Sequence, residues 1–377
     1  MASRIKPDGI TVLRLWVKAG GRCEFNGCNE YLLTDALTLE EANLANVAHI
    51  VAAEPKGPRG ESELSPEDRS KIENLMLTCL VHHKVVDDKA LEKNFPVELL
   101  QTYKKDHEKR ILELTGIKEG NKTLVLRLKG KIAGEAVSIS NSQIKNAILP
   151  RYMADSTGVE IDLTSLPDGD DASYWETGKQ IITQNIGEIF RARIGKQQPD
   201  HISVFAIGPI PLLIFLGNQL SNAVETDLYH LQKDIENWTW KTDGGTVRYK
   251  TNLLSKGEEG SSIALILSLS GPIKVEDLPE DIRGGWVYEI TLDNMTPSKL
   301  FMRKREDLLE FKKSYREFLS KIREQHHGVH EVHLFPAIPT PVAVMCGRDL
   351  IKKTDPELII YDFNKSKGVF VEILSVN

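Results

Sequence analysis

Residues 201–220 read HISVFAIGPIPLLIFLGNQL, two apolar runs on either side of Gly208, Pro209 and Pro211. The first run is short and continuously apolar, which is typical of a strand that is buried on both faces. Proline suits the first turn of a helix, because the N–H that it lacks has no partner there. This stretch therefore predicts a buried strand that leads directly into an apolar helix.

The same pattern returns at residues 332–350, VHLFPAIPTPVAVMCGRDL. A helix expected over 176–194 matches one expected over 306–324 at the same shift of 130 residues. Four residues recur in register over twelve positions: Pro209, Pro211, Gly217 and Leu220 become Pro339, Pro341, Gly347 and Leu350. A duplication explains this better than the general likeness of any two strand–helix units. Because strands and helices alternate, we expect two related α/β halves with mostly parallel sheets, 120–245 and 246–377.

The composition sets outer limits. The chain has 377 residues, 41% of them apolar, which suits two or three domains and excludes a disordered or collagen-like protein. The net charge is −6, and residues 1–100 hold twelve Lys and Arg against sixteen Asp and Glu, so the protein is not a globally basic nucleic-acid binder. The longest apolar run, 207–216, is too short for a bilayer, and the first ten residues lack the apolar segment of a secretory signal. We expect a cytoplasmic protein without a membrane partner.

Three of the four cysteines lie in the first 80 residues. Four residues separate Cys23 from Cys28, and two residues separate Cys79 from His82. We call these two closely spaced pairs of metal-ligand residues the first and the second knuckle. In a reducing cytoplasm, they predict a closed, structural Zn²⁺ site of three thiolates and one imidazole. A segment of about 100 residues or fewer also needs such a staple. The alternative is that these four residues are ordinary core residues.

Between the two knuckles lies NVAHIVA, residues 46–52, whose alternation predicts a strand with His49 on one face. Asn74 precedes the second knuckle, His83 follows it, and Asp87 lies one helical turn beyond His83. A strand histidine, a loop asparagine and a helix histidine are the elements of a β-β-α metal nuclease. Taken alone, His49 would be a core histidine. The rest of residues 1–95 is expected to be irregular and rich in turns.

Residues 16–88 resemble an HNH endonuclease of the zinc-stapled kind, through these residues in order: Cys23, Cys28, His49-Ile50, Asn74-Leu75, Cys79 and His82-His83. The resemblance implies that His49 is the general base that deprotonates the attacking water. It also implies that His83 is a ligand of a catalytic Mg²⁺, and that Asn74 fixes the loop and orients the base or the metal. Hydrolysis of a phosphodiester needs a water nucleophile, a base with a pKa near neutrality and a cation on the scissile phosphate.

One position departs from the family pattern. Many such nucleases carry Asp or His, a metal ligand, just before the base, and this chain has Ala48. The metal must then depend on His83 and a second group, for which Asp87 is the candidate and Glu54 a weaker one. Asp87 could equally be a solvated helix acid. The basic loop PKGPRG at 55–60 is expected either to contact DNA phosphates or to be an ordinary surface loop.

The repeated strand–Pro-x-Pro–helix unit suits anion binding. A helix N-terminus at the carboxyl end of a strand attracts phosphate, and two related halves place two such sites near a pseudo-twofold axis. A ligand whose phosphates are related by approximate symmetry would fit them. The alternative is that the turns are only tight connections.

Residues 120–377 resemble the SAVED domain, itself two fused CARF-like, Rossmann-like halves. The likeness is carried by HISVFAIGPIPLLIFLG, VHLFPAIPTPVAVMCGRDL and DPELIIYDFN. It implies that this part binds a cyclic di- or trinucleotide, and an HNH nuclease fused to SAVED resembles the effectors of CBASS anti-phage systems, which degrade double-stranded DNA. The candidate ligand-binding residues are Lys129, Tyr174, Trp175, Pro209, Ile210, Pro211, Ser268, Ser270, Thr340 and Pro341.

The expected organisation is therefore a nuclease domain at 1–95, a connecting helix and linker at 96–119, and a SAVED domain at 120–377. Leucines in the helix at 96–115 suggest a dimer contact, and messenger binding is expected to drive a resting monomer or dimer into a higher homo-oligomer. Two rivals stay open: a modification-dependent HNH restriction endonuclease, and a nucleotide-sensing regulator with an inactive nuclease domain. For the histidine-rich run at 326–333, a helix end followed by a strand is expected rather than a metal site.

Overall fold

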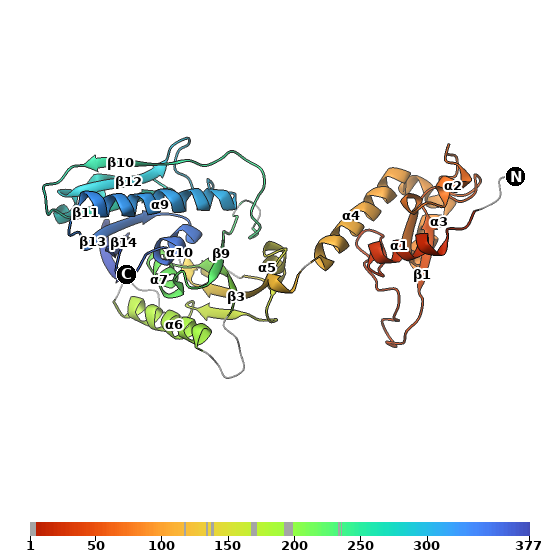
Figure 1. The fold of residues 1–377 in the computed structure, drawn as a ribbon, viewed down its shortest axis with the longest axis horizontal. Coiled ribbons are helices and arrows are strands. Elements are labelled where there is room, and N and C mark those ends of the chain that lie inside the picture. The colour runs from red at the N-terminus through yellow and green to blue at the C-terminus, as the bar shows by residue number, and fades with distance from the viewer. Residues whose placement is uncertain are drawn as a thin grey trace. The chain divides into compact units, whose positions relative to one another are not determined.

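A computed structural model of the chain describes residues 5–116, 118–132, 135–136, 139–166, 172–191, 199–232, 234 and 236–377. The chain divides into two compact units, Met1–Lys118 and Glu119–Asn377 (Figure 1). Each unit is described by itself. Among the described residues, no helix has the length and apolar character needed to cross a membrane.

The first unit contains a two-stranded antiparallel sheet that leads straight into a helix. Its elements are α1 (Gly9–Ala19), β1 (Ala45–His49), α2 (Pro66–Arg69), η1 (Ile72–Asn74), β2 (Leu75–Cys79), α3 (Leu80–Asp87), η2 (Lys89–Asn94) and α4 (Val97–Thr115). In the sheet, His49 at the end of β1 lies opposite Leu75 of β2. The strand expected around His49 and the helix expected at 96–115 are confirmed.

The expectation that the rest of the first 95 residues is irregular is wrong for α1. Asp8 caps this helix by accepting a hydrogen bond from the N–H of Thr11 at 2.6 Å, and the helix ends at Gly20 in the left-handed region. The helix packs on α4, where the Nε2 of His107 lies 2.9 Å from the carbonyl oxygen of Ala19. Helix α4 is therefore part of the first unit.

The second unit begins with a parallel sheet. Its first half contains β3 (Lys122–Lys129), β4 (Lys131–Ile132), β5 (Glu135–Ala136), α5 (Asn141–Ala147), β6 (Tyr152–Met153), β7 (Val159–Asp162), α6 (Ala172–Phe190), β8 (His201–Ile207), α7 (Ile210–Leu220) and β9 (Glu225–Tyr229). The strand order is β6-β3-β8-β9, with β7 also paired to β3, and all of these pairings are parallel.

The second half repeats this plan and adds antiparallel edges. It contains β10 (Tyr249–Ser255), β11 (Ile263–Ser268), η4 (Val275–Asp277), α8 (Glu280–Arg283), β12 (Trp286–Leu292), α9 (Arg305–Gln325), β13 (Glu331–Ala337), α10 (Thr340–Arg348), β14 (Glu357–Asn364) and β15 (Val369–Val376). The order is β10-β12-β11-β13-β14-β15; the four central strands are parallel, and β10 and β15 are antiparallel. The prediction of two α/β halves with mostly parallel sheets is confirmed.

The two halves meet through α7 and α10, which lie side by side in Figure 1 and pack closely on each other. A Cβ on Gly217 would lie 1.9 Å from the carbonyl oxygen of Val344, and one on Gly347 would lie 1.8 Å from that of Ile214. Gly217 and Gly347 are equivalent positions of the repeat, so the duplicated glycines let two helix backbones touch. One hydrophobic core runs through both halves, from β3 and β8 to β11 and β13.

Candidate functional sites

Three thiols and one imidazole converge in the first unit. The ligand atoms of Cys23, Cys28, Cys79 and His82 all lie within 4.8 Å of one another. The Nδ1 of His82 is 3.2 Å from the Sγ of Cys79 and 3.7 Å from that of Cys23. Ligands of a tetrahedral Zn²⁺ with bonds of about 2.0–2.3 Å lie about 3.5–3.8 Å apart. The donor set and its spacing therefore fit a zinc ion.

Aromatic packing orients the imidazole of this Cys/His cluster. The ring of Phe25 stacks on that of His82 with centroids 4.1 Å apart and planes 10° apart. Phe25 is itself held edge-on by Phe95 and Tyr103. A ring locked in this way loses little freedom when its nitrogen binds a cation, which favours a tight site.

A buried carboxylate beside the cluster has no counterpart in the sequence prediction. Glu24 is fully buried, and its Oε2 accepts a hydrogen bond from the N–H of Leu77 at 2.6 Å. Burial raises the pKa of Glu24 to about 7, although the charge of Lys104, 3.9 Å away, acts in the other direction. Glu24 ties the loop of the first knuckle to β2. No local pattern marks this role.

Asn74 holds the segment that follows His49. Its Oδ1 accepts a hydrogen bond from the N–H of Val51 at 2.8 Å, and its Nδ2 donates to the carbonyl oxygens of Val51 at 2.8 Å and Arg69 at 2.9 Å. These three bonds fix the chain just beyond the end of β1. The catalytic roles of His49 and Asn74 stay predictions.

His83 and Asp87 share one face of α3. The Nε2 of His83 lies 3.4 Å from the Oδ2 of Asp87, and both side chains are partly exposed. An imidazole and a carboxylate at this distance on an accessible face suit a divalent cation that keeps several water ligands. Glu54, the weaker candidate, is exposed in the loop after β1.

Arg59 does not have the role expected of the basic loop. Its side chain is buried and donates to the carbonyl oxygens of Ile50 at 2.6 Å and Val86 at 2.8 Å, so it joins the end of β1 to α3. It is therefore not available to DNA phosphates, whereas Lys56 is exposed. Arg69 is buried in a similar way and donates to four backbone carbonyls between Ala52 and Leu64. The sequence reasoning missed this use of arginine: the basic loop that contains Arg59 was expected to lie on the surface, and Arg69 lies in no recognisable motif.

In the second unit, the Pro-x-Pro turns lie where they were expected. Pro209 and Pro339 are the N-cap residues of α7 and α10, directly after β8 and β13. Ile210 and Thr340 are the first helical residues, and both are partly exposed. Pro211 and Pro341, one position further on, are buried. Each half therefore presents a helix N-terminus at the carboxyl end of its sheet.

Several of the other candidate ligand-binding residues are already engaged. Ser268 is buried, and its hydroxyl accepts a hydrogen bond from the N–H of Ile273 at 3.2 Å. The Nζ of Lys129 lies 2.9 Å from a carboxylate oxygen of Glu160. Trp175 packs in the core, whereas its neighbour Tyr174 is partly exposed. The N–H of Ser270 donates to the carbonyl oxygen of Ala337 at 2.7 Å.

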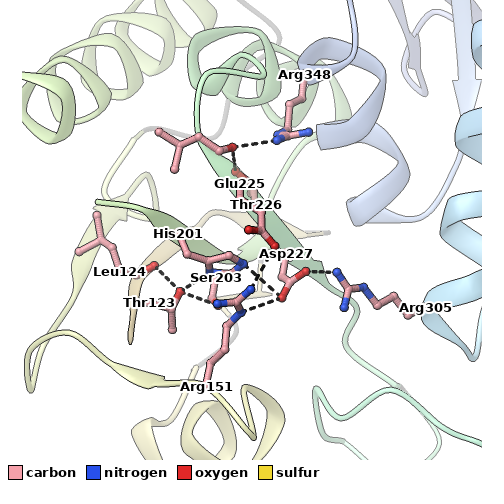
Figure 2. A network of polar contacts seen from close by, with 11 residues as sticks. Thr123, Leu124, Arg151, His201, Ser203, Glu225, Thr226, Asp227, Arg305 and Arg348 are labelled. Carbon is pink, nitrogen blue, oxygen red and sulfur yellow. Dashed lines mark hydrogen bonds and ion pairs between the residues drawn. The ribbon is translucent and has the colours of Figure 1, made fainter. Parts of the chain in front are cut away.

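A polar network, which we call the Asp227 network, lies at the amino ends of the first half's strands (Figure 2). The carboxylate of Asp227 on β9 is 3.3 Å from the Nε2 of His201 and 3.5 Å from the Nε of Arg151, and it also pairs with Arg305 of α9. The Oγ1 of Thr123 is 2.8 Å from the Nδ1 of His201. Burial alone would raise the pKa of Asp227, but the hydrogen bond from His201 and the nearby arginines hold that pKa below its usual value.

The Asp227 network joins the two halves. Arg305 belongs to the second half, and so does Arg348 of α10, which donates to the carbonyl oxygen of Val224 beside β9 at 2.9 Å (Figure 2). No local signal in the sequence points to these contacts, because their members are scattered between residues 123 and 348.

Two Rossmann-like halves that share one core, each with a helix starting at the carboxyl end of a buried strand, define the class of the second unit. Residues 182–376, which are 195 of the 377 residues, match the family of the SMODS-associated and fused to various effectors sensor domain, SAVED. The chain belongs to the SAVED family. A sensor domain is thus present, as the resemblance implied.

Solved structures similar to this chain include two Cap4 SAVED/CARF-domain containing receptors. The receptor of Acinetobacter baumannii with the cyclic trinucleotide 2'3'3'-cAAA is 12% identical, with a TM-score of 0.46 over 78% of this chain and 62% of that one. The receptor of Moraxella osloensis is 13% identical, with a TM-score of 0.41 over 78% of this chain and 60% of that one. This chain therefore spans less than two thirds of either receptor. No curated protein matches it.

Proposed function

We propose that this protein is a metal-dependent DNA endonuclease that a cyclic di- or trinucleotide activates, and that it degrades double-stranded DNA in anti-phage defence. The observation that carries the proposal is the joining, in one chain, of a SAVED sensor and a separate unit in which a Cys/His cluster braces a β-β-α arrangement. In this proposal the first unit is the effector, and the SAVED sensor fused to it controls its activity.

In the proposed reaction, His49 at the end of β1 accepts the proton of the attacking water. His83 and Asp87 on α3 would hold the catalytic Mg²⁺, which would supply charge stabilisation for the scissile phosphate and the leaving oxygen. Asn74 keeps the segment after β1 in place through its three hydrogen bonds. Because Ala48 stands where many such nucleases have a metal ligand, the cation would have few protein ligands. This suits Mg²⁺, an ion that usually keeps several water ligands and binds substrate phosphate.

The Cys/His cluster has a different task in this proposal. Cys23, Cys28, Cys79 and His82 hold a structural Zn²⁺ that joins the loop after α1 to the junction of β2 and α3. His82 and His83 are adjacent in the chain, so the zinc site fixes the start of the helix that carries the Mg²⁺ ligands. All four zinc ligands come from the protein, which leaves no position for substrate.

One incubation tests the proposal. Plasmid DNA with Mg²⁺ should be cut only when the cognate member of a panel of cyclic di- and trinucleotides is present. Cleavage without any messenger would favour the modification-dependent restriction endonuclease. No cleavage under any condition would favour a regulator with an inactive nuclease domain, the rival that Ala48 supports.

The matched variants are His49→Ala and Asp106→Asn, an exposed acid on α4. Loss of the general base should reduce cleavage by at least about a hundredfold and leave messenger affinity unchanged, because base and sensor belong to separate units. Asp106→Asn should cleave as the natural protein does. Full activity in His49→Ala would show that this histidine is only structural.

A further inference from the structure

A cavity of about 830 Å³ lies at the amino ends of β11, β12 and β13 in the second half. We call it the amino-edge pocket. Its size is that of a small-molecule site. The Pro-x-Pro turns follow the opposite, carboxyl ends of the strands, so this pocket lies away from the site expected for the messenger. The histidine-rich run at 326–333 forms part of its wall.

The equivalent edge of the first half carries the Asp227 network. At the repeat shift of 130, His201 of β8 corresponds to Glu331 of β13, and Ser203 corresponds to His333. In the first half, His201 and Ser203 are tied to Thr123 in the Asp227 network (Figure 2). In the second half, Glu331 and His333 line the pocket instead. Equivalent strand positions therefore carry different side chains in the two halves, so the hollow is not a necessary result of the repeated fold.

The wall of the pocket contains a fixed aromatic platform. The indole Nε1 of Trp286 donates to the carbonyl oxygen of Glu258 at 3.1 Å, and the ring of His326 packs edge-on with centroids 4.8 Å apart. Trp286 is nevertheless partly exposed, and the Nζ of Lys256 lies 5.8 Å from its ring centroid. This ammonium group lies over the ring, so a planar ligand could stack on Trp286 once the flexible Lys256 side chain moves aside, with the indole itself held in place.

Charges of both signs surround the platform. Lys256 and Lys321 supply cations, and Glu259 and Glu331 supply carboxylates. Burial lowers the pKa of His326 and His333, so these two imidazoles are neutral near pH 7. Within the described part of the chain, the side chain of Lys321 makes no hydrogen bond or ion pair. The lining therefore offers donors for an anion and acceptors for N–H groups.

We propose that the amino-edge pocket binds a guanine nucleotide, with the base stacked on Trp286 and the phosphate near Lys321. A guanine edge presents the N–H donors that a glutamate accepts, and a phosphate needs the free ammonium group. The nucleotide is either a free monophosphate or the 5'-phosphorylated end of a DNA fragment, and both carry the same chemistry. This site is additional to the messenger site and does not depend on nuclease activity.

Titration calorimetry with the full chain tests this proposal. Guanosine 5'-monophosphate should bind the natural protein, and guanosine or ribose 5-phosphate should each bind at least about tenfold more weakly. Lys321→Gln and Trp286→Leu should each weaken nucleotide binding by at least about tenfold. Lys313→Gln, an exposed lysine on the same helix α9, should have no effect. A short single strand with a 5'-phosphorylated guanosine, compared with its unphosphorylated form, identifies the source.

Three results would overturn the proposal. One is the absence of binding by both the monophosphate and the DNA end at millimolar concentration. Another is binding that survives Lys321→Gln, a surface change that leaves the fold intact. The third is competition between the monophosphate and the activating cyclic nucleotide, with both lost in Lys321→Gln, because the pocket would then be the messenger site. None of these readouts requires DNA cleavage. The binding test can therefore be interpreted even if the nuclease assay shows no activity.

Discussion

At the scale of single residues, the first unit depends on side chains that bond to backbone. Asn74, Arg59 and Arg69 all donate to carbonyl oxygens of the chain that follows β1. A buried carbonyl without a partner costs about 1–3 kcal/mol, so each of these side chains supports the loop beside His49. The Cys/His cluster braces the same unit from the other end of β2.

Cys79→Ala should unfold the first unit, because metal binding and folding are coupled in a unit held by four ligands. The protein should lose one equivalent of zinc by elemental analysis and become sensitive to protease before residue 118. The matched control is Cys346→Ala, which removes a buried cysteine from α10 in the second unit and should keep the zinc. A soluble, zinc-free Cys79→Ala protein with full activity would remove the zinc assignment.

At the scale of elements, the strand–Pro-x-Pro–helix units were predictable and their surroundings were not. Apolar runs and prolines are local signals, so β8 with α7 and β13 with α10 could be located from 20 residues each. Helix α1 was missed because its β-branched and aromatic residues, GITVLRLWVKA, do not mark a helix. The Asp227 network and the amino-edge pocket gather residues from distant segments, and no sequence window contains them.

Gly217→Ala should destabilise the second unit. The added Cβ would overlap the carbonyl oxygen of Val344, so α7 and α10 must separate, and the free energy of unfolding should fall by about 1–3 kcal/mol or more. Gly187→Ala is the matched control, because a Cβ in that part of α6 meets nothing within 4 Å. It should stabilise the protein by about 0.5–1 kcal/mol. Urea unfolding of the three proteins measures both changes, and equal stabilities would mean that the helix crossing tolerates a methyl group.

Asp227→Asn should destabilise the contact between the halves in a way that depends on pH. The folded state holds the pKa of Asp227 below its usual value, so the ionised carboxylate adds stability above that usual value, about 3.8. At pH 7 the variant should lose about 2 kcal/mol or more, because His201 and two arginines lose their anion. The difference should shrink as the pH falls below about 4 and should disappear only once the pH is below the lowered pKa of Asp227 in the folded state.

The control for this prediction is Asp243→Asn, which removes an exposed acid 3.7 Å from Arg303. A surface pair of this kind contributes about 0–1 kcal/mol, so its stability should change little at any pH. Urea unfolding from pH 7 to pH 3 compares the two variants. A deficit of Asp227→Asn that persists unchanged at pH 3 would mean that packing, rather than charge, explains the loss.

At the scale of the whole molecule, the proposed nuclease would have to be silent at rest. Its first 100 residues carry more acidic than basic side chains, so one copy should hold DNA weakly. A unit with the single active site proposed above would also cut only one strand. Both limits are relieved if the messenger brings copies together, because paired sites cut both strands and several weak DNA contacts add up through avidity. Leu112 on α4 is 74% exposed, which suits a contact between copies.

We therefore predict that the cognate cyclic nucleotide at least doubles the mass measured by light scattering, and that cleavage rises faster than linearly with protein concentration. Leu112→Gln should weaken both effects, because it removes apolar surface from the proposed contact. Lys109→Gln, an exposed residue on the same helix, should not. A sample whose mass stays constant while it becomes fully active would show that the messenger switches the nuclease within a single particle. The short segment between α4 and β3 would then have to transmit the signal.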